Sequence, residues 1–293
     1  MKLQNLFFSW NIRGYGKAEK KRSIRRMISN ERPKFILLQE TKYSNLLDEV
    51  VRDLCGKFSS FDVKCIPPIG LSGGLCSIWN SEIFKCDFSV EVQGAIVCVG
   101  RLCKVNLRVG IINVYAPNDS IRRREFLEEL RNWITANSIP VIIGGDFNIV
   151  RNKEESTGVS MKTKDMECFS DFINDQGLID MPCSGGKYTW SSLRQVPSFS
   201  RLHHFLISTE CAGLWTNLTQ RVLPKGLSDH NPIVLSVDNV NWAKYFKWFD
   251  HWGEEKELVD LIRKTVSTTE EYGISKILRE CKATTKVWVQ ELR

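Results

Sequence analysis

Short apolar runs alternate with amphipathic segments between residues 3 and 238 of this 293-residue chain. The helix expected over 121–137 is the clearest, because its apolar residues recur at helical spacing. The runs 94–101 and 104–115 predict an antiparallel pair of strands. The pattern predicts further strands at 5–9, 35–39, 61–66, 74–79, 84–91, 140–145, 187–191, 204–208, 215–221 and 232–237, and further helices at 17–30, 44–54 and 164–176.

Many strands with few helices indicate an α/β fold in which two sheets pack face to face and helices cover the outside. We expect one domain over 1–238. Near Val240 the composition changes, since six aromatic residues crowd one stretch and a charged helical pattern follows. We therefore expect 239–293 to be a separate aromatic and helical extension. Its aromatics beside Lys244 and Lys247 either stack on nucleic-acid bases or dock on protein.

Composition narrows the class of protein. With 42% hydrophobic and 26% charged residues, the chain is a globular protein rather than a disordered one. Its net charge of +7 suits an anionic partner. No apolar stretch reaches the roughly 18 residues of a membrane helix, and we see no secretory signal. The ten scattered cysteines contain no CxxC pair, so we expect reduced thiols in an intracellular protein.

Polar residues gather at the edges of five predicted strands. An apolar strand that ends in an amide, a carboxylate or an imidazole delivers that group to an edge of the sheet. Five such edges predict one polar site built from distant segments, as in a metal-assisted phosphoester hydrolase. The five patterns are Ser9-Trp10-Asn11, Gln39-Glu40-Thr41, Asn113-Val114-Tyr115, Gly145-Asp146-Phe147-Asn148 and Ser228-Asp229-His230.

The carboxylates and amides of these patterns suit work on a phosphate ester. Glu40 closes an apolar strand, where a carboxylate is costly without a partner such as Mg²⁺. Asp146 and Asn148 alternate around Phe147, so both can face one side, where the carboxylate orients or deprotonates a water that the amide holds. Asn11 offers an uncharged contact beside the metal or to a phosphate.

Two further patterns offer stabilisation of charge. Tyr115 brings a hydroxyl to a phosphate oxygen, and Asp229 places a carboxylate beside His230, a side chain that changes charge near neutrality. Each pattern alone has an ordinary structural explanation, such as a turn-forming Asn or a cap before Pro232. All five together, in this order, favour catalysis.

The five patterns and their flanks resemble motifs of the endonuclease/exonuclease/phosphatase superfamily, which includes apurinic/apyrimidinic endonucleases and DNase I-like enzymes. The resemblance covers about residues 3–238. Three more segments narrow it to the endonuclease domain of LINE-type non-LTR retrotransposons, particularly those of plants: Ser72-Gly73-Gly74-Leu75, Tyr188-Thr189-Trp190-Ser191 and Ser200-Arg201-Leu202. The stretch 245–252 is similar to the segment that joins this domain to a reverse transcriptase, so a fragment of a longer polyprotein is one alternative.

The resemblance implies a DNase I-like fold, which is a four-layer α/β sandwich of two packed mixed β-sheets flanked by helices. It also implies Mg²⁺-dependent hydrolysis of a phosphodiester, with Mn²⁺ as a substitute. Glu40 would hold the metal, with Asn11 and Asp229 nearby. In the retrotransposon branch the reaction nicks one DNA strand and leaves a 3′-hydroxyl that primes reverse transcription.

The same resemblance implies the remaining roles. Asp146 would position or activate the attacking water, and Asn148 would orient it. Tyr115 and Asn118 would contact the phosphate, as would Asn11, and Asp229 would support catalysis beside the histidine. The residue that would stabilise the charged transition state is His230.

One position departs from the family pattern. After Arg201-Leu202 the family has an Asp that hydrogen-bonds the catalytic His230, and this chain has His203. His203 brings no negative charge, although in its neutral form it can accept a hydrogen bond. Losing the analogous carboxylate character in a serine protease costs about 10⁴ in turnover. We therefore expect a weakened or inactive enzyme, the alternative being a benign variant at a strand start.

Two basic clusters follow site-bearing segments, one between Lys17 and Arg26 and one at Arg122–Arg124. They either flank a phosphate backbone or form solvated helix faces. The first also has the composition of a nuclear-import patch. We expect a monomer, nuclear rather than cytoplasmic, that binds DNA but neither a membrane nor a protein partner.

Three hypotheses remain: a weakened metal-dependent DNA nuclease, a phosphoesterase for small molecules, and a remnant that binds nucleic acid without cleaving it. The Trp190 segment and the basic clusters favour nucleic acid. The feature that favours the remnant is His203.

Overall fold

The structure is a computed structural model that describes residues 4–42, 54, 60–69, 72–157, 163–192, 194–215, 217–237, 252, 255–269 and 274–291. The chain divides into two compact units, Met1–Val240 and Asn241–Arg293.

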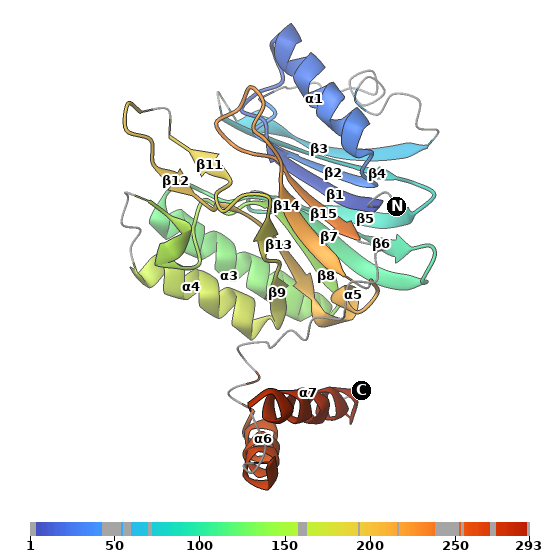
Figure 1. Cartoon of the computed structure of the whole chain (residues 1–293). Coiled ribbons are helices and arrows are strands. Elements are labelled where there is room, and N and C mark those ends of the chain that lie inside the picture. The colour runs from blue at the N-terminus through green and yellow to red at the C-terminus, as the bar shows by residue number, and fades with distance from the viewer. Residues whose placement is uncertain are drawn as a thin grey trace. The chain divides into compact units, whose positions relative to one another are not determined.

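Two mixed β-sheets form the centre of the first unit (Figure 1). In the described residues, the seven-stranded sheet has the order β10-β14-β15-β1-β2-β4-β3, and β1 and β2 are parallel. Its strands are β1 (Gln4–Asn11), β2 (Phe35–Gln39), β3 (Phe61–Ile69), β4 (Ser72–Asn80), β10 (Cys183–Ser184), β14 (Leu218–Val222) and β15 (Ile233–Val237).

The second sheet has six strands in the described part of the chain, in the order β5-β6-β7-β8-β13-β9, and β7 and β8 are parallel. The pair β6–β7 is antiparallel, as the sequence predicts. The strands are β5 (Phe84–Val92), β6 (Ala95–Leu102), β7 (Leu107–Tyr115), β8 (Val141–Asp146), β9 (Leu178–Asp180) and β13 (His203–Ser208), and a separate hairpin pairs β11 (Trp190–Ser191) with β12 (Phe199–Ser200).

Helices cover the outer faces of both sheets (Figure 1). On the seven-stranded sheet, α1 packs Ile24 and Ile28 against Phe8. On the six-stranded sheet, α3 and α4 bury Phe126 and Phe169. The helices of this unit are α1 (Ala18–Glu31), α3 (Ser120–Asn137), α4 (Thr163–Asp175) and α5 (Thr209–Ala212), with a 3₁₀ turn at Lys153–Glu155.

Aromatic side chains fill the space between the two sheets. Phe7 stacks on Phe35 with ring centroids 4.4 Å apart, and it meets Phe205 of the other sheet at 6.0 Å. Because side chains alternate along a strand, Phe7 faces this core while Phe8 faces α1. Each fully buried Phe contributes roughly 1.5–3 kcal/mol through apolar burial. The four-layer sandwich is therefore confirmed.

The helix predicted over 121–137 is confirmed as α3, and the stripe Phe126, Leu127, Leu130 and Ile134 is buried. Its N-cap is Asp119, whose carboxylate accepts hydrogen bonds from two backbone N–H groups of the first turn.

Several predicted boundaries are wrong. The strand predicted over 187–191 is only two residues long, because the Thr189 hydroxyl accepts two backbone N–H groups that a strand partner would otherwise bind. The strand predicted from 215 begins at Leu218. The short elements β9, β10, β12 and α5 carry too little periodicity to predict. The helix predicted over 44–54 lies outside the described residues except for Leu54.

The second unit contains α6 (Lys256–Thr269) and α7 (Ile274–Glu291), which contact each other through the hydroxyls of Thr265 and Thr284 at 3.1 Å. The predicted aromatic stretch lies outside the described residues except for Trp252, which packs edge-on against Trp288 with ring centroids 6.2 Å apart. Within the described residues, no helix has both the length and the apolar character to cross a membrane.

Candidate active site

Polar ends of strands from both sheets meet at one place. The buried Asn11 closes β1, and its amide Nδ2 donates to Glu40 Oε1 at 2.9 Å and to Asp146 Oδ2 at 2.8 Å. Glu40 follows β2 of the first sheet, whereas Asp146 ends β8 of the second. One amide therefore joins the two carboxylates across the interface between the sheets.

A pair of buried side-chain amides also joins the two sheets next to the Asn11 bridge. Gln39 Nε2 donates to Asn113 Oδ1 at 2.7 Å, and Asn113 Nδ2 donates to the Cys76 carbonyl oxygen at 3.1 Å. Both side chains are fully buried, so their hydrogen bonds fix the register of the two sheets below the site.

Glu40 is held by several donors besides Asn11. The Lys42 Nζ lies 3.2 Å from Glu40 Oε2, and the Tyr115 hydroxyl lies close enough to the same carboxylate for its charge to act on it. Burial and this carboxylate raise the pKa of Tyr115, so its hydroxyl keeps its proton at neutral pH.

Four residues at the site have a left-handed backbone. Arg13, Glu40, Lys42 and Asn148 all have φ between +49° and +51°, a region that non-glycine residues rarely adopt. Each such residue stores about 1 kcal/mol or more, and residues of this kind cluster at functional sites.

Glycine chemistry sets the position of Asp146. A Cβ on Gly145, whose φ is +153°, would overlap the Val114 carbonyl oxygen of the neighbouring strand. The Asp146 Oδ1 then accepts the Asn148 backbone N–H at 3.0 Å, while Asn148 Nδ2 donates to the Ala116 carbonyl oxygen at 2.7 Å. Asp146 is thereby fixed as a hydrogen-bond acceptor.

The loop carrying Asp229 and His230 is anchored on both sides. Trp10 Nε1 donates to the His230 carbonyl oxygen at 2.9 Å, and Trp190 Nε1 donates to Asp229 Oδ2 at 3.1 Å. The Ser228 hydroxyl donates to the Asn11 carbonyl oxygen at 2.9 Å. The motif residues are thus locked to β1 and to the hairpin β11–β12.

His203 lies directly behind His230. The nitrogens His203 Nε2 and His230 Nδ1 are 3.2 Å apart, and Asp146 Oδ2 lies 3.6 Å and 3.5 Å from them. His203 Nδ1 is 2.8 Å from the Thr189 hydroxyl. Among the described residues, the carboxylate oxygen closest to these two rings is Asp146 Oδ2, at 3.5 Å from His230 Nδ1.

Both imidazoles are neutral at pH 7. Burial lowers the pKa of His203, and it lowers the pKa of His230 to about 3, although the nearby Asp146 acts in the opposite direction. His230 therefore offers a neutral ring rather than an imidazolium.

Two sets of side chains have the chemistry to hold a metal ion. Glu40 and Asp229 converge on one cation already, since the Arg13 Nε lies 3.0 Å from Asp229 Oδ1 and 3.8 Å from Glu40 Oε1. Such paired hard oxygens fit Mg²⁺. The second set consists of Asp146, His203 and His230, whose ligand atoms all lie within 4.8 Å of one another.

The loop after β7 carries Asn118 and leads into the Arg122–Arg124 cluster. Asn118 is exposed, and the structure records no hydrogen bond from its side chain to the other described site residues. Its carbonyl oxygen accepts the Arg123 Nη1 at 2.9 Å. The interpretation of Arg122–Arg124 as a phosphate-binding cluster is wrong for Arg123, which is buried and paired with Asp165 at 3.2 Å.

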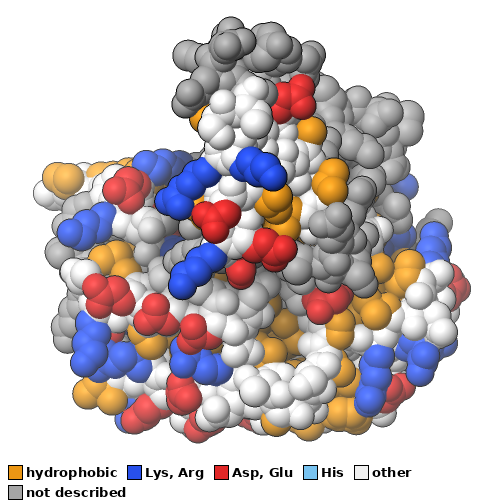
Figure 2. Space-filling model, turned by 90° about the horizontal axis from the view of Figure 1, so that it is seen from below, with side chains coloured by type: hydrophobic (Ala, Val, Ile, Leu, Met, Phe, Trp, Pro, Cys, Tyr) orange, Lys and Arg blue, Asp and Glu red, His pale blue; other side chains and the backbone are white. Residues whose placement is uncertain are grey.

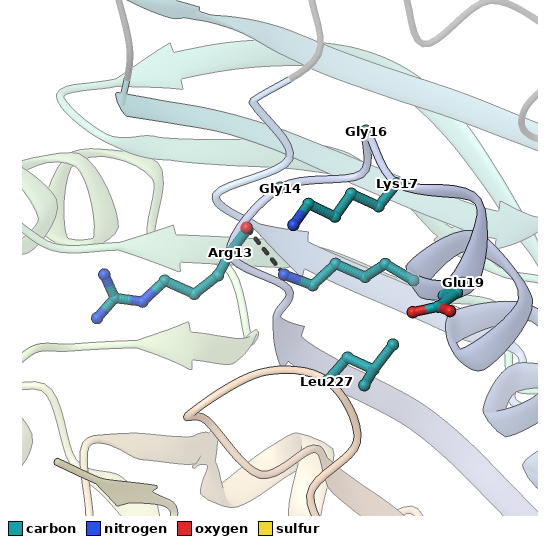
Figure 3. Close-up of a pocket in the computed structure, with 7 residues that line it drawn as sticks. Arg13, Gly14, Gly16, Lys17, Glu19 and Leu227 are labelled. Atoms are coloured by element: carbon teal, nitrogen blue, oxygen red, sulfur yellow. Dashed lines mark hydrogen bonds between the residues drawn. The ribbon is translucent and has the colours of Figure 1, made fainter. Parts of the chain in front are cut away.

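The first basic cluster borders the site. A pocket between the Arg13 turn and the start of α1 is lined by two lysines, of which Lys20 donates through Nζ to the Arg13 carbonyl oxygen at 2.9 Å (Figure 3). The other is Lys17. The lysines of this pocket differ from the face shown in Figure 2, where basic and acidic side chains are interspersed.

The sequence prediction missed three residues of the site: Arg13, Lys42 and Thr189. The first two lie inside or beside the predicted motifs, so their position in the chain was the available signal. Thr189 contacts His203 only through the tertiary fold.

Comparisons with known proteins agree with this architecture. The profile of the Endonuclease/Exonuclease/phosphatase family matches residues 8–230. An AP endonuclease from Leishmania major has a TM-score of 0.60 and 17% identity, over 80% of this chain and 88% of that one. The endonuclease domain of TRAS1, a telomere-specific non-LTR retrotransposon, has a TM-score of 0.58 and 14% identity, over 79% of this chain and 97% of that one.

A third similar structure is the 3′ phosphatase NExo from Neisseria bound to a product DNA hairpin. It has a TM-score of 0.59 and 18% identity, over 79% of this chain and 98% of that one. No curated protein sequence matches the chain.

Proposed function

The chain belongs to the Endonuclease/Exonuclease/phosphatase family, and on this basis we propose that it is a metal-dependent phosphodiesterase that nicks DNA. The proposal extends to an origin in a plant LINE-type retrotransposon and to action in the nucleus as a monomer. Support comes from the sequence motifs and from the similar structures, which include a retrotransposon endonuclease, an AP endonuclease and a phosphatase bound to DNA.

The single observation that carries the proposal is the amide bridge at Asn11. It places Glu40, a metal-binding candidate, and Asp146, a water-activating candidate, within one hydrogen bond of the same nitrogen. Separate roles for two neighbouring carboxylates are what phosphodiester hydrolysis requires.

The residues divide the work as follows. The amides of Asn11 and Asn148 fix Asp146, which takes the proton of the attacking water. Water adds to phosphorus, the bond from phosphorus to the 3′ oxygen breaks, and that oxygen gains a proton to become a 3′-hydroxyl. Tyr115 donates a hydrogen bond to a phosphate oxygen, because its raised pKa keeps the hydroxyl protonated. His230 stabilises the charged phosphate from the other side.

A divalent cation bound by Glu40 and Asp229, with Asn11 beside them, would neutralise charge on the phosphate. The exposed Asn118 reaches the phosphate in this proposal from the loop after β7. The basic side chains Lys17 and Lys20 would contact neighbouring phosphates and make binding sensitive to salt.

A second candidate function is DNA binding without cleavage. The observation that favours it is the contact between His203 and His230 at 3.2 Å, because a neutral imidazole cannot stabilise charge on His230 as a carboxylate would. Orientation of the ring survives, so we propose a weakened enzyme ahead of an inactive one.

Nicking of supercoiled plasmid DNA tests both functions. Native protein, Glu40→Ala and His203→Asp are compared with Mg²⁺, with Mn²⁺ and with EDTA. We expect slow metal-dependent nicking by the native chain, none by Glu40→Ala and faster nicking by His203→Asp.

Lys104→Ala serves as a control, because it removes a positive charge from the exposed turn between β6 and β7 of the six-stranded sheet. If all variants bind DNA in a salt-dependent way and none nicks it, the binding function replaces the nuclease. Cleavage of a soluble phosphoester that is unaffected by competing DNA would point instead to a small-molecule enzyme.

A further inference from the structure

We propose that the Arg13 guanidinium is a built-in cation that occupies the Glu40–Asp229 pair when no metal is bound, and that a divalent cation must displace it. The freed guanidinium then binds the phosphate of the substrate. This inference rests on the proposed function for its second half only, since competition for the carboxylates is a property of the free protein.

The contacts of Arg13 are those of a cation in a carboxylate site. Its Nε and Nη2 donate to the two oxygens of Asp229 at 3.0 Å and 3.1 Å, which is a bidentate pair. The same Nε lies 3.8 Å from Glu40 Oε1 and 3.3 Å from His230 Nε2. One guanidinium thus contacts both hard-oxygen ligands and the histidine beside them.

The backbone of Arg13 is anchored at both sides of the residue, whereas its side chain is partly open to solvent. Its φ of +49° is maintained by hydrogen bonds at both sides of the residue: its N–H donates to Asn11 Oδ1 at 3.1 Å, and its carbonyl oxygen accepts Lys20 Nζ. The side chain remains 43% exposed, and in Figure 3 it extends away from Lys17 and Glu19. A strained, anchored base with a half-exposed head suits a group that changes partners.

Displacement follows from charge. A divalent cation between Glu40 and Asp229 would stand where the guanidinium now contacts both, and the two positive groups repel each other. Arg13 then needs another anion, and its planar fork matches a phosphate better than the point charge of a lysine does. Lys42 lies 3.2 Å from Glu40 Oε2 and, among the described residues, forms an ion pair with that carboxylate alone, so it remains in place.

The test is equilibrium binding of Mn²⁺ alone, followed by the electron paramagnetic resonance signal of the free ion. We expect Arg13→Gln to bind Mn²⁺ about 3- to 10-fold tighter than the native chain. This change in affinity corresponds to the free energy of one partly exposed ion pair, which the metal no longer has to break. Arg13→Lys should lie between them. Lys104→Gln removes an equal charge from the exposed β6–β7 turn, outside the site, and should leave affinity within about twofold.

A gain that persists in the Glu40→Gln background would assign the ion to another site and overturn the proposal. So would unchanged or weaker Mn²⁺ binding by folded Arg13→Gln, because a merely structural arginine does not compete.

The second half is measured as coupling between Mn²⁺ and a short DNA duplex. In the native chain Mn²⁺ should strengthen DNA binding, and in Arg13→Gln this gain should be lost while binding in EDTA is unchanged. An equal gain in both proteins overturns the transfer to phosphate. Failure of the nuclease proposal is separately visible as absent nicking, which leaves the Mn²⁺ competition intact.

Discussion

His203 and His204 are neighbours on β13, and both are fully buried, yet they belong to opposite kinds of site. His204 lies 3.2 Å from Asp180 Oδ1, and Asp180 also binds Arg201 at 2.6 Å. His203 faces His230 and a hydroxyl, with Asp146 at 3.6 Å. One face of the strand holds a carboxylate that binds both a histidine and an arginine, whereas on the other face two imidazoles contact each other and share Asp146 at 3.5 Å and 3.6 Å.

The pKa directions express the same difference. Burial alone would raise the pKa of Asp180, but His204 and Arg201 lower it to about 2. On the other face, burial lowers the pKa of His203 and His230, although Asp146 acts in the opposite direction. The comparison teaches that two adjacent residues of one strand can serve different purposes: His204 belongs to a charged network within the fold, and His203 to the neutral pair at the candidate site.

The largest expected effect is on activity. His203→Asp places a carboxylate beside His230 Nδ1 and should increase the single-turnover nicking rate by about 10³-fold. This gain is smaller than the roughly 10⁴-fold loss of turnover when a catalytic triad loses its carboxylate. Rates are measured on supercoiled plasmid at saturating Mg²⁺. His204→Asp is the matched control and should give no gain. An unchanged rate for His203→Asp would show that this position does not limit catalysis.

The next effect is on stability. Asp180→Asn leaves Arg201 and His204 without their shared anion, and the free energy of unfolding should fall by about 3 kcal/mol. Urea denaturation followed by tryptophan fluorescence gives the value. Asp146→Asn, on the other face, should abolish nicking with a loss of stability below about 1 kcal/mol. Equal losses for the two variants would contradict the division of roles.

The smallest effect is the dependence of stability on pH. His203 and His230 have a lowered pKa in the folded chain and an ordinary pKa of 6.5 when unfolded. Their neutral burial therefore favours folding fully above pH 6.5, and this contribution is lost as the pH falls towards the folded values.

Between pH 7.5 and 5.5 His230 should remove about 1.4 kcal/mol of stability, because its folded pKa of about 3 lies below this range. His203 contributes in the same direction. Thermal unfolding across this range measures the loss. His203→Asp removes one titrating group and raises the pKa of His230, so its loss should be less than half as large. A native chain equally stable at both pH values would refute the neutral pair.

Much of the fold was predictable because its signals are local. The periodic stripe of α3 and the apolar runs of β1, β2, β7 and β8 give the correct layers. The polar residues that follow those strands, such as Glu40 and Asp146, converge as expected. Strands of two or three residues, such as β9 and β12, contain too few positions to show a period of two.

The sequence predicted the carboxylates and amides of the candidate site, but not the arginines that pair with carboxylates in the fold. Charge density alone suggested a phosphate-binding role for Arg123, whereas Asp165 of α4, 42 residues away, holds it inside the protein. The bridging role of Arg13 depends on Asp229, 216 residues further along the chain. Pairing over such separations leaves no periodic signal.

The sequence by itself determined the family, the order of the motifs and the replacement at position 203, since each is written in consecutive residues. Only the tertiary structure decided which cation stands between Glu40 and Asp229, and that His203 touches His230 through neutral nitrogens. The physical reason is that burial and distance set both the charge of an imidazole and the partner of a guanidinium, and these arise only when the two sheets pack.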